Sequence, residues 1–176
     1  MAPVCKVAVD GLAPNSFHLS HWVGNQTPQA LKADTATEIA LNYLANPHRK
    51  SLFPYANIIT NSHFDTDGLF AVFSLLHPET AHSMGHTLVA AAEAGDFCSF
   101  SSEEGVQIDL LIKELISDRS PLRPLFKKIP GPKEAAWYKT ILPLIHDLHK
   151  IKDQYRELWQ PQFDRVPASM PAFKRD

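Results

Sequence analysis

A histidine and two aspartates stand at alternate positions in "NIITNSHFDTDGLF", residues 57–70. In an extended chain, alternate side chains point to the same side, so His63, Asp65 and Asp67 would share one face. Two carboxylates at close range repel each other unless a cation neutralises them or one of them takes up a proton. The spacing therefore predicts a metal site or a general acid–base site built on these three residues, with His63 as ligand or catalytic group.

The donor atoms limit the cations that this cluster could hold. An imidazole nitrogen beside carboxylate oxygens suits Mn²⁺, Fe²⁺ or Zn²⁺, whereas Mg²⁺ and Ca²⁺ prefer oxygen ligands alone. A calcium-binding loop is excluded because the twelfth position counted from His63 is Ser74, where that loop requires a glutamate. Gly68 would let the backbone turn into a helix, and the amides that open this helix would favour a substrate anion such as a phosphate oxygen.

A purely structural interpretation competes with the metal site. In it, Asp67 caps a helix that begins at residue 69, and His63 is an ordinary polar residue at the surface. Capping accounts for one acid but leaves the second acid and the histidine unexplained, so the sequence favours the metal or acid–base site.

Two strands and a helix must position this cluster. "VCKVAVDG" (residues 4–11) and "PYANIITNS" (residues 54–62) have the composition of strands, and the consecutive β-branched residues 58–60 predict that the second strand is buried. Apolar residues 69, 72, 73 and 76 form one stripe of a helix. Ligands bind at the carboxyl ends of strands in open α/β sheets, which is where the polar cluster falls.

The rest of the chain reads mainly as helix. Asp34 is expected to cap a helix over residues 35–45, and further helices are expected over 83–94, 103–117 and 134–159, the last kinked at Pro143. The fold class is therefore α/β, a small mostly parallel sheet flanked by helices, with a helical C-terminal third. We expect a single domain over residues 1–160 and an extended or disordered tail over 161–176.

Two further acids could complete a metal site. Asp10 ends the first strand and would lie near Asp65 if the two strands are parallel neighbours. Asp96 follows Gly95 at a helix end, where it is either another ligand or a solvated acid beside the end of the helix.

Four residues upstream could serve catalysis or substrate binding. Glu38 stands beside apolar residues and could face inward as a general base, while His21 could be a proton donor or a ligand. Trp22 could form a stacking wall for the substrate, or simply pack against the core. Asp34 lies four residues before Glu38, on the same helix face, and could bind substrate if it is not a cap.

Composition narrows the class of protein. With 17 basic and 19 acidic residues the net charge is −2, so there is no strong nucleic-acid signal. No run of about 18 apolar residues predicts a membrane span. The two cysteines are too few for a disulfide framework, and no secretory signal is visible. We expect a cytoplasmic protein that acts on a small molecule and does not associate with a membrane.

Three blocks resemble a bacterial family of unknown function. They are "LSHWVGNQTPQALKADTATEIALNYL", "NSHFDTDGLFAVFSLLHPE" and "AAEAGDF", and the resemblance spans residues 8 to 100. The element H-x-D-x-D-G is also similar to the first motif of the DHH phosphoesterase superfamily. That similarity implies Mn²⁺ as the first choice of cofactor, with Mg, Fe or Zn as alternatives. It also implies that His63, Asp65 and Asp67 are metal ligands, and that the substrate is a phosphodiester or polyphosphate. The Asp-His-His run that names the superfamily is absent from this sequence.

The leading functional hypothesis is a metal-dependent hydrolase of the phosphoesterase type, acting on a small molecule that can contain phosphate. One alternative is a metal-dependent lyase or small-molecule tailoring enzyme on the same ligands. The other is a non-catalytic binding or scaffolding protein, a homodimer for instance, in which the helix over 134–159 contacts a partner.

Overall fold

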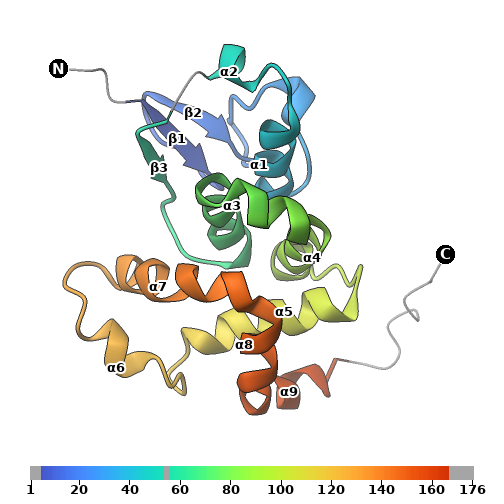
Figure 1. Cartoon of the computed structure of the whole chain (residues 1–176), viewed down its shortest axis with the longest axis vertical. Coiled ribbons are helices and arrows are strands. Elements are labelled where there is room, and N and C mark those ends of the chain that lie inside the picture. The colour runs from blue at the N-terminus through green and yellow to red at the C-terminus, as the bar shows by residue number, and fades with distance from the viewer. Residues whose placement is uncertain (1–4, 54–55, 167–176) are drawn as a thin grey trace. The chain divides into compact units, whose positions relative to one another are not determined.

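The computed structural model describes residues 5–53 and 56–166. Contacts within the chain divide it into two compact units, Met1–Val89 and Ala90–Asp176, and each is considered by itself (Figure 1). The expectation of one domain over residues 1–160 stays a prediction. Most of the expected tail, residues 167–176, lies outside the described residues.

The first unit contains a three-stranded parallel sheet, as the sequence predicts. Its strands follow the order β2-β1-β3, and both pairings are parallel. The strands are β1 (Lys6–Val9), β2 (Ser16–Leu19) and β3 (Ile58–Thr60). In the central strand, Val7 and Val9 are 2% and 0% exposed.

The expectation that the strand near residue 58 is buried is wrong. Ile58 is 44% exposed, because β3 pairs with β1 alone and forms an edge of the sheet. β-branched residues favour an extended backbone whether or not the strand is covered on both faces. Residues 54 and 55 of the predicted strand lie outside the described part of the chain.

The helices of the first unit pack on the sheet and on each other. Residues 66–74 of α3 are all buried, and α3 contacts α1, β1 and β3 (Figure 1). A buried helix of this kind fixes the ends of the strands that it contacts. The helical elements are η1 (Gln29–Leu31), α1 (Ala36–Ala45), α2 (Arg49–Leu52), α3 (Thr66–Leu76) and α4 (Pro78–Phe97), the last of which continues into the second unit.

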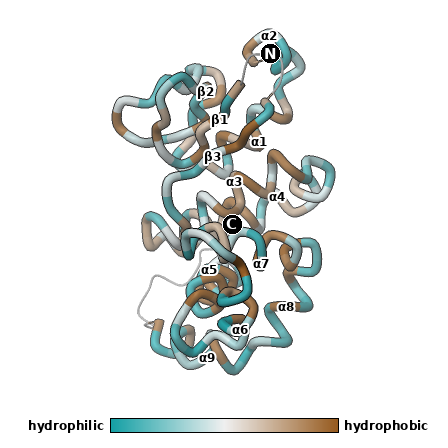
Figure 2. Tube along the Cα trace, turned by 90° about the vertical axis from the view of Figure 1, so that its left-hand side faces the viewer, coloured by the Kyte–Doolittle hydropathy of each residue, from teal (hydrophilic) through white to brown (hydrophobic). Residues whose placement is uncertain are grey.

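The described part of the second unit is helical. Its elements are α5 (Glu103–Leu115), α6 (Arg123–Phe126), α7 (Lys133–Ile141), η2 (Leu142–Asp147), α8 (Leu148–Gln154) and α9 (Arg156–Phe163). α5 contacts α8 and α9. Hydrophobic and hydrophilic residues alternate along these helices (Figure 2), and no helix among the described residues is long and apolar enough to cross a membrane.

Three helix boundaries differ from those expected. The pattern over 134–159 is interrupted, because Pro143 has no amide hydrogen and its ring disfavours the preceding turn, so α7 ends at Ile141 and a 3-10 segment follows. The helix expected over 83–94 extends further in both directions as α4. The last helix continues to Phe163, three residues into the predicted tail.

Candidate metal centre

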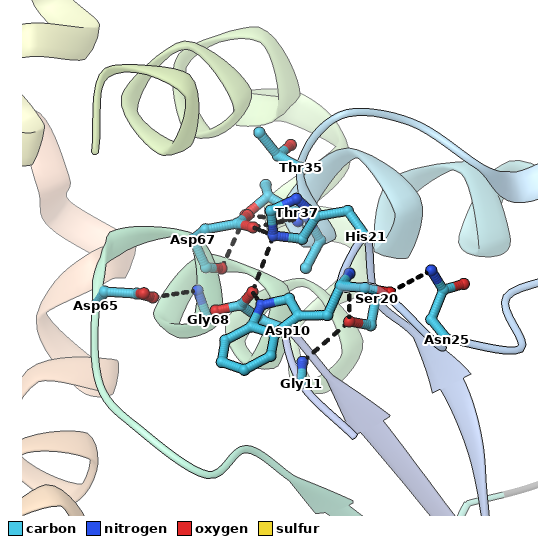
Figure 3. A network of polar contacts seen from close by, with 12 residues as sticks. Asp10, Gly11, Ser20, His21, Asn25, Thr35, Thr37, Asp65, Asp67 and Gly68 are labelled. Atoms are coloured by element: carbon cyan, nitrogen blue, oxygen red, sulfur yellow. Dashed lines mark hydrogen bonds and ion pairs between the residues drawn. The ribbon is translucent and has the colours of Figure 1, made fainter. Parts of the chain in front are cut away.

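Asp10 occupies the centre of a polar cluster at the carboxyl end of β1 (Figure 3). Its side chain is 1% exposed, and its φ of 45° lies in the left-handed region that few residues other than glycine adopt. Its amide still donates to the Leu19 carbonyl at 3.3 Å, so the strand pairing holds this turn in place. Backbone strain of this kind is typical of functional sites.

One group of potential ligands combines Asp10 with His63 and Asp65. His63 Nε2 lies 2.7 Å from Asp65 Oδ2 and 3.0 Å from Asp10 Oδ2. The three side chains offer ligand atoms within 4.8 Å of one another. The other oxygen of Asp65 accepts the Gly68 amide at 2.8 Å and caps α3, which fixes the direction of this carboxylate.

A second group combines Asp10 with His21 and Asp67, again with ligand atoms within 4.8 Å of one another. His21 Nε2 lies 3.2 Å from Asp10 Oδ1 and 3.7 Å from Asp67 Oδ2. The Asp67 carboxylate is fully buried and accepts the Ala36 and Thr37 amides at 2.7 Å each (Figure 3). The N-terminus of α1 therefore orients this acid.

The expectation that His63, Asp65 and Asp67 share one face of an extended segment is wrong. The extended chain ends at Asp65, because the side chain of this residue caps a helix that already begins at Thr66. Asp67 falls in the first helical turn and is directed to α1. The alternative that Asp67 caps the following helix is also wrong, since Asp65 is the cap. The three residues divide between two groups that Asp10 joins.

The electrostatics of the cluster favour a bound cation. Burial and the charge of Asp10 raise the pKa of Asp67 to about 7, against the opposing effect of the α1 amides. Burial and Asp10 also raise the pKa of Asp65. Burial alone would raise the pKa of Asp10, but the contacts with His21, His63 and Trp22 outweigh it and lower that pKa. The protein thus holds three carboxylates together without enough positive charge for all of them.

One oxygen of Asp10 lacks a hydrogen bond. Asp10 Oδ2 is buried and accepts no hydrogen bond from the described residues, even though His63 Nε2 is 3.0 Å away. A ring nitrogen carries at most one hydrogen, and the shorter contact of His63 Nε2 is to Asp65. Leaving a buried carboxylate oxygen without a partner is costly. A cation among these three side chains would satisfy it, so the donor set fits a divalent metal.

Gly68 provides space for these carboxylates. A Cβ atom at this position would lie 1.9 Å from Asn61 Nδ2, 3.0 Å from Asp10 Oδ2 and 3.1 Å from Asp65 Oδ1. The expectation that Gly68 lets the backbone turn into the helix is wrong, because α3 already begins at Thr66. Its amide already donates to Asp65, and the predicted contact with a substrate anion stays a prediction.

Trp22 borders the cluster. Its Nε1 donates to Asp10 Oδ1 at 3.0 Å, and its ring centroid is 5.4 Å from that of His63. The indole is 44% exposed, so it is not a core residue. Its position agrees with the predicted wall beside the site, and its contact with substrate stays a prediction.

Asp34 and Glu38 are not part of these two groups. Asp34 is exposed and does not cap α1; the cap is Thr35, whose Oγ1 accepts the Glu38 amide at 3.1 Å. Glu38 follows in the first turn of α1, and its catalytic role stays a prediction. Asp96 belongs to the second unit, near the end of α4, and its part in the site also stays a prediction.

Sequence reasoning missed the residues that support the ligands. Ser20 Oγ accepts the Gly11 amide at 3.1 Å and the Trp22 amide at 3.2 Å, and so joins the loops after β1 and β2. Thr35 could have been found, since a threonine followed three residues later by a glutamate is a capping-box pattern. The Ala36 and Thr37 amides leave no signal, because every residue except proline has an amide hydrogen.

The fold and the cluster define an α/β protein with a carboxylate–imidazole centre at the carboxyl edge of a parallel sheet. The chain belongs to a family of unknown function, DUF6687, whose model matches residues 2–175. This confirms the resemblance to an uncharacterised family. Neither the curated proteins nor the solved structures gave a match to the chain.

Proposed function

We propose that the chain is a metal-dependent hydrolase of the phosphoesterase type, with two divalent cations on either side of Asp10. The observation that carries this proposal is that the two oxygens of the Asp10 carboxylate face different histidines. Oδ1 lies 3.2 Å from His21 and Oδ2 lies 3.0 Å from His63, and each imidazole is accompanied by a further aspartate. A carboxylate with a different set of donors at each oxygen is suited to bridge two ions.

The two donor sets would divide the ligands as follows. His63 and Asp65 would hold one ion, His21 and Asp67 would hold the other, and Asp10 would bind both. Mixed imidazole and carboxylate donors suit Mn²⁺ best in this proposal, with Mg²⁺, Fe²⁺ or Zn²⁺ as alternatives. Two-ion centres of this kind activate water as a nucleophile and neutralise charge on a phosphoryl group.

The protein contributes the rigidity of the centre. The α1 amides fix Asp67, and the Gly68 amide fixes Asp65, so neither carboxylate has to be ordered when a cation or a substrate binds. Because His21 serves as a ligand here, Glu38 is the remaining predicted proton carrier. We also propose a cytoplasmic location, in keeping with the free Cys5 and Cys98.

The first experiment measures metal and hydrolysis together. The purified protein is dialysed against Mn²⁺, its metal content is determined by mass spectrometry, and hydrolysis of bis(4-nitrophenyl) phosphate is followed. We expect about two ions per chain. Asp10→Asn should remove both the metal and the activity. Asp118→Asn is the matched control, since Asp118 is 97% exposed and pairs only with Arg123 among the described residues.

The outcomes separate the alternatives. Wild-type protein that binds no metal at millimolar Mn²⁺ would contradict the proposal, and would leave the binding or scaffolding role. Bound metal without hydrolysis of any phosphodiester would instead favour a lyase or tailoring enzyme on the same ligands.

A further inference from the structure

Apolar side chains are exposed in two loops that follow the strands of the metal centre. Leu12 in the loop after β1 is 44% exposed, while Trp22 and Val23 in the loop after β2 are 44% and 98% exposed. Leaving large apolar side chains in water forgoes the free energy of burying them. We call these three residues the apolar rim.

The two loops that carry the apolar rim are joined. Ser20 Oγ accepts amides from both loops, at Gly11 and at Trp22. A Cβ atom at Gly24 would lie 3.7 Å from Leu12 Cδ1, which is ordinary van der Waals contact. The loop that carries Trp22 and Val23 therefore lies against the loop that carries Leu12.

Trp22 connects the apolar rim to the proposed metal ligands. The indole of Trp22 donates to Asp10 Oδ1 and lies beside the ring of His63. His63 is 31% exposed at its side chain, so the metal centre opens to solvent next to the indole. A group attached to a phosphorus atom at the centre would reach the rim within a few bonds.

Among the described residues, histidines are the basic side chains that pair with the carboxylates of the centre. No lysine or arginine in the described part of the chain forms an ion pair with Asp10, Asp65 or Asp67. Two divalent cations and the three carboxylates of the first unit would leave a net charge of about +1, and a fourth acidic ligand would lower it to about 0. A charge this low suits a phosphodiester, which carries a single negative charge, whereas polyphosphates bring several charges and are usually bound by lysine or arginine.

We infer that the substrate is a phosphodiester of an aromatic or apolar alcohol, and that Leu12, Trp22 and Val23 bind its apolar group. This inference rests on the proposed function. Water would add to phosphorus, the bond from phosphorus to one ester oxygen would break, and a proton would pass to that oxygen. The products are an alcohol and a phosphomonoester. The apolar rim sets which diester binds, and the metal ligands carry out the chemistry.

The test compares two diesters that share one leaving group. Manganese-loaded protein hydrolyses bis(4-nitrophenyl) phosphate or methyl 4-nitrophenyl phosphate. For each variant, kcat/KM for the first diester is divided by kcat/KM for the second. Comparing this ratio between variants cancels the difference in intrinsic reactivity. We expect Trp22→Ala to lower this ratio about tenfold, and Leu12→Ser and Val23→Ser about threefold each. The change should lie in KM for the aryl diester.

Two controls separate binding from other effects. Trp22→Phe loses the hydrogen bond to Asp10 but keeps an aromatic ring. Because the ring is what binds the apolar group, this variant should keep most of the preference for the aryl diester. Leu76→Ser removes a 49% exposed side chain at the opposite end of α3 and should leave the ratio unchanged. Metal content is measured for every variant and should equal that of the wild type in Leu12→Ser and Val23→Ser.

Each result has a distinct meaning. Hydrolysis of both diesters with a ratio that none of the three rim substitutions changes would overturn the inference and leave the proposed function standing. Faster hydrolysis of pyrophosphate than of either diester would also overturn it. Metal-loaded wild-type protein that hydrolyses neither diester would end the proposed function, and the inference with it.

Discussion

Gly68→Ala is the substitution for which the structure gives the sharpest expectation. The new Cβ would lie 1.9 Å from Asn61 Nδ2, so the Asn61 side chain must move by about 1 Å or more. It would also lie 3.0 Å from Asp10 Oδ2 and 3.1 Å from Asp65 Oδ1, which is closer than most Cβ contacts in proteins. The two carboxylates that share His63 would therefore be displaced by a few tenths of an ångström.

Two effects on stability oppose each other in this variant. Alanine is more favourable than glycine inside a helix by about 1 kcal/mol, and Gly68 lies within α3. The displacement of Asn61 costs a similar amount or less, since that residue is only partly buried. We therefore expect the melting temperature of the metal-free protein to change by only a few degrees, while the proposed metal centre loses its geometry.

Thermal unfolding with and without Mn²⁺ measures this difference. A cation at about 100 times its Kd stabilises the folded protein by about 2.7 kcal/mol, or about 5–10 °C in a chain of this size. The wild type should show this rise, and Gly68→Ala should show less than about a third of it. Gly85→Ala is the matched control, because among the described residues a Cβ there meets only Leu41 Cδ1 of another helix, at 3.5 Å. A full Mn²⁺ response in Gly68→Ala would refute the reasoning.

Two further predictions concern the acids of the cluster, and a third concerns the core of the second unit. Because the pKa of Asp67 is raised from 3.8 to about 7, the metal-free protein should lose stability as pH rises from about 4 through 7. Mn²⁺ should therefore raise the melting temperature more at pH 8 than at pH 5. Asp67→Asn, followed by the same scans, should flatten that pH dependence. Asp10→Asn should lower the pKa of Asp65, because the charge of Asp10 helps to raise it, and carboxyl titration by NMR in metal-free protein would show this. Trp159→Ala removes a side chain that is 1% exposed and should cost about 3–5 kcal/mol in chemical denaturation without changing the Mn²⁺ content of the folded protein.

The convergence of Asp10 and Asp65 could be predicted from the sequence. Both follow strands, and neighbouring parallel strands bring their carboxyl ends to one edge of the sheet. The separation of Asp65 from Asp67 could not be predicted by counting alternate positions. Both acids are suitable helix caps, and the choice between them depends on which carboxylate the α1 amides bind, at a distance of 30 and 31 residues along the chain.

The limits of pattern reasoning differ between the two units. Apolar periodicity continues across Pro143, so it predicts one helix where the backbone forms α7, η2, α8 and the start of α9. Periodicity reports which side chains can be buried together, and it does not report whether each backbone amide has a hydrogen to donate. In the first unit the acid itself, Asp67, can be recognised in the sequence. Its partners cannot, because they are ordinary backbone amides of α1.

The strand order explains why the proposed centre has two sides. β1 is central, so Asp10 at its end has β2 on one side and β3 on the other. The loop after β2 supplies His21 and the loop after β3 supplies His63, and each imidazole therefore approaches a different oxygen of the same carboxylate. The left-handed backbone conformation of Asp10 ends β1 at this residue, where both histidines reach its carboxylate. A single shared aspartate between two flanking histidines is thus a consequence of the order β2-β1-β3, and a substitution that displaced Asp10 would disturb both sides of the centre at once.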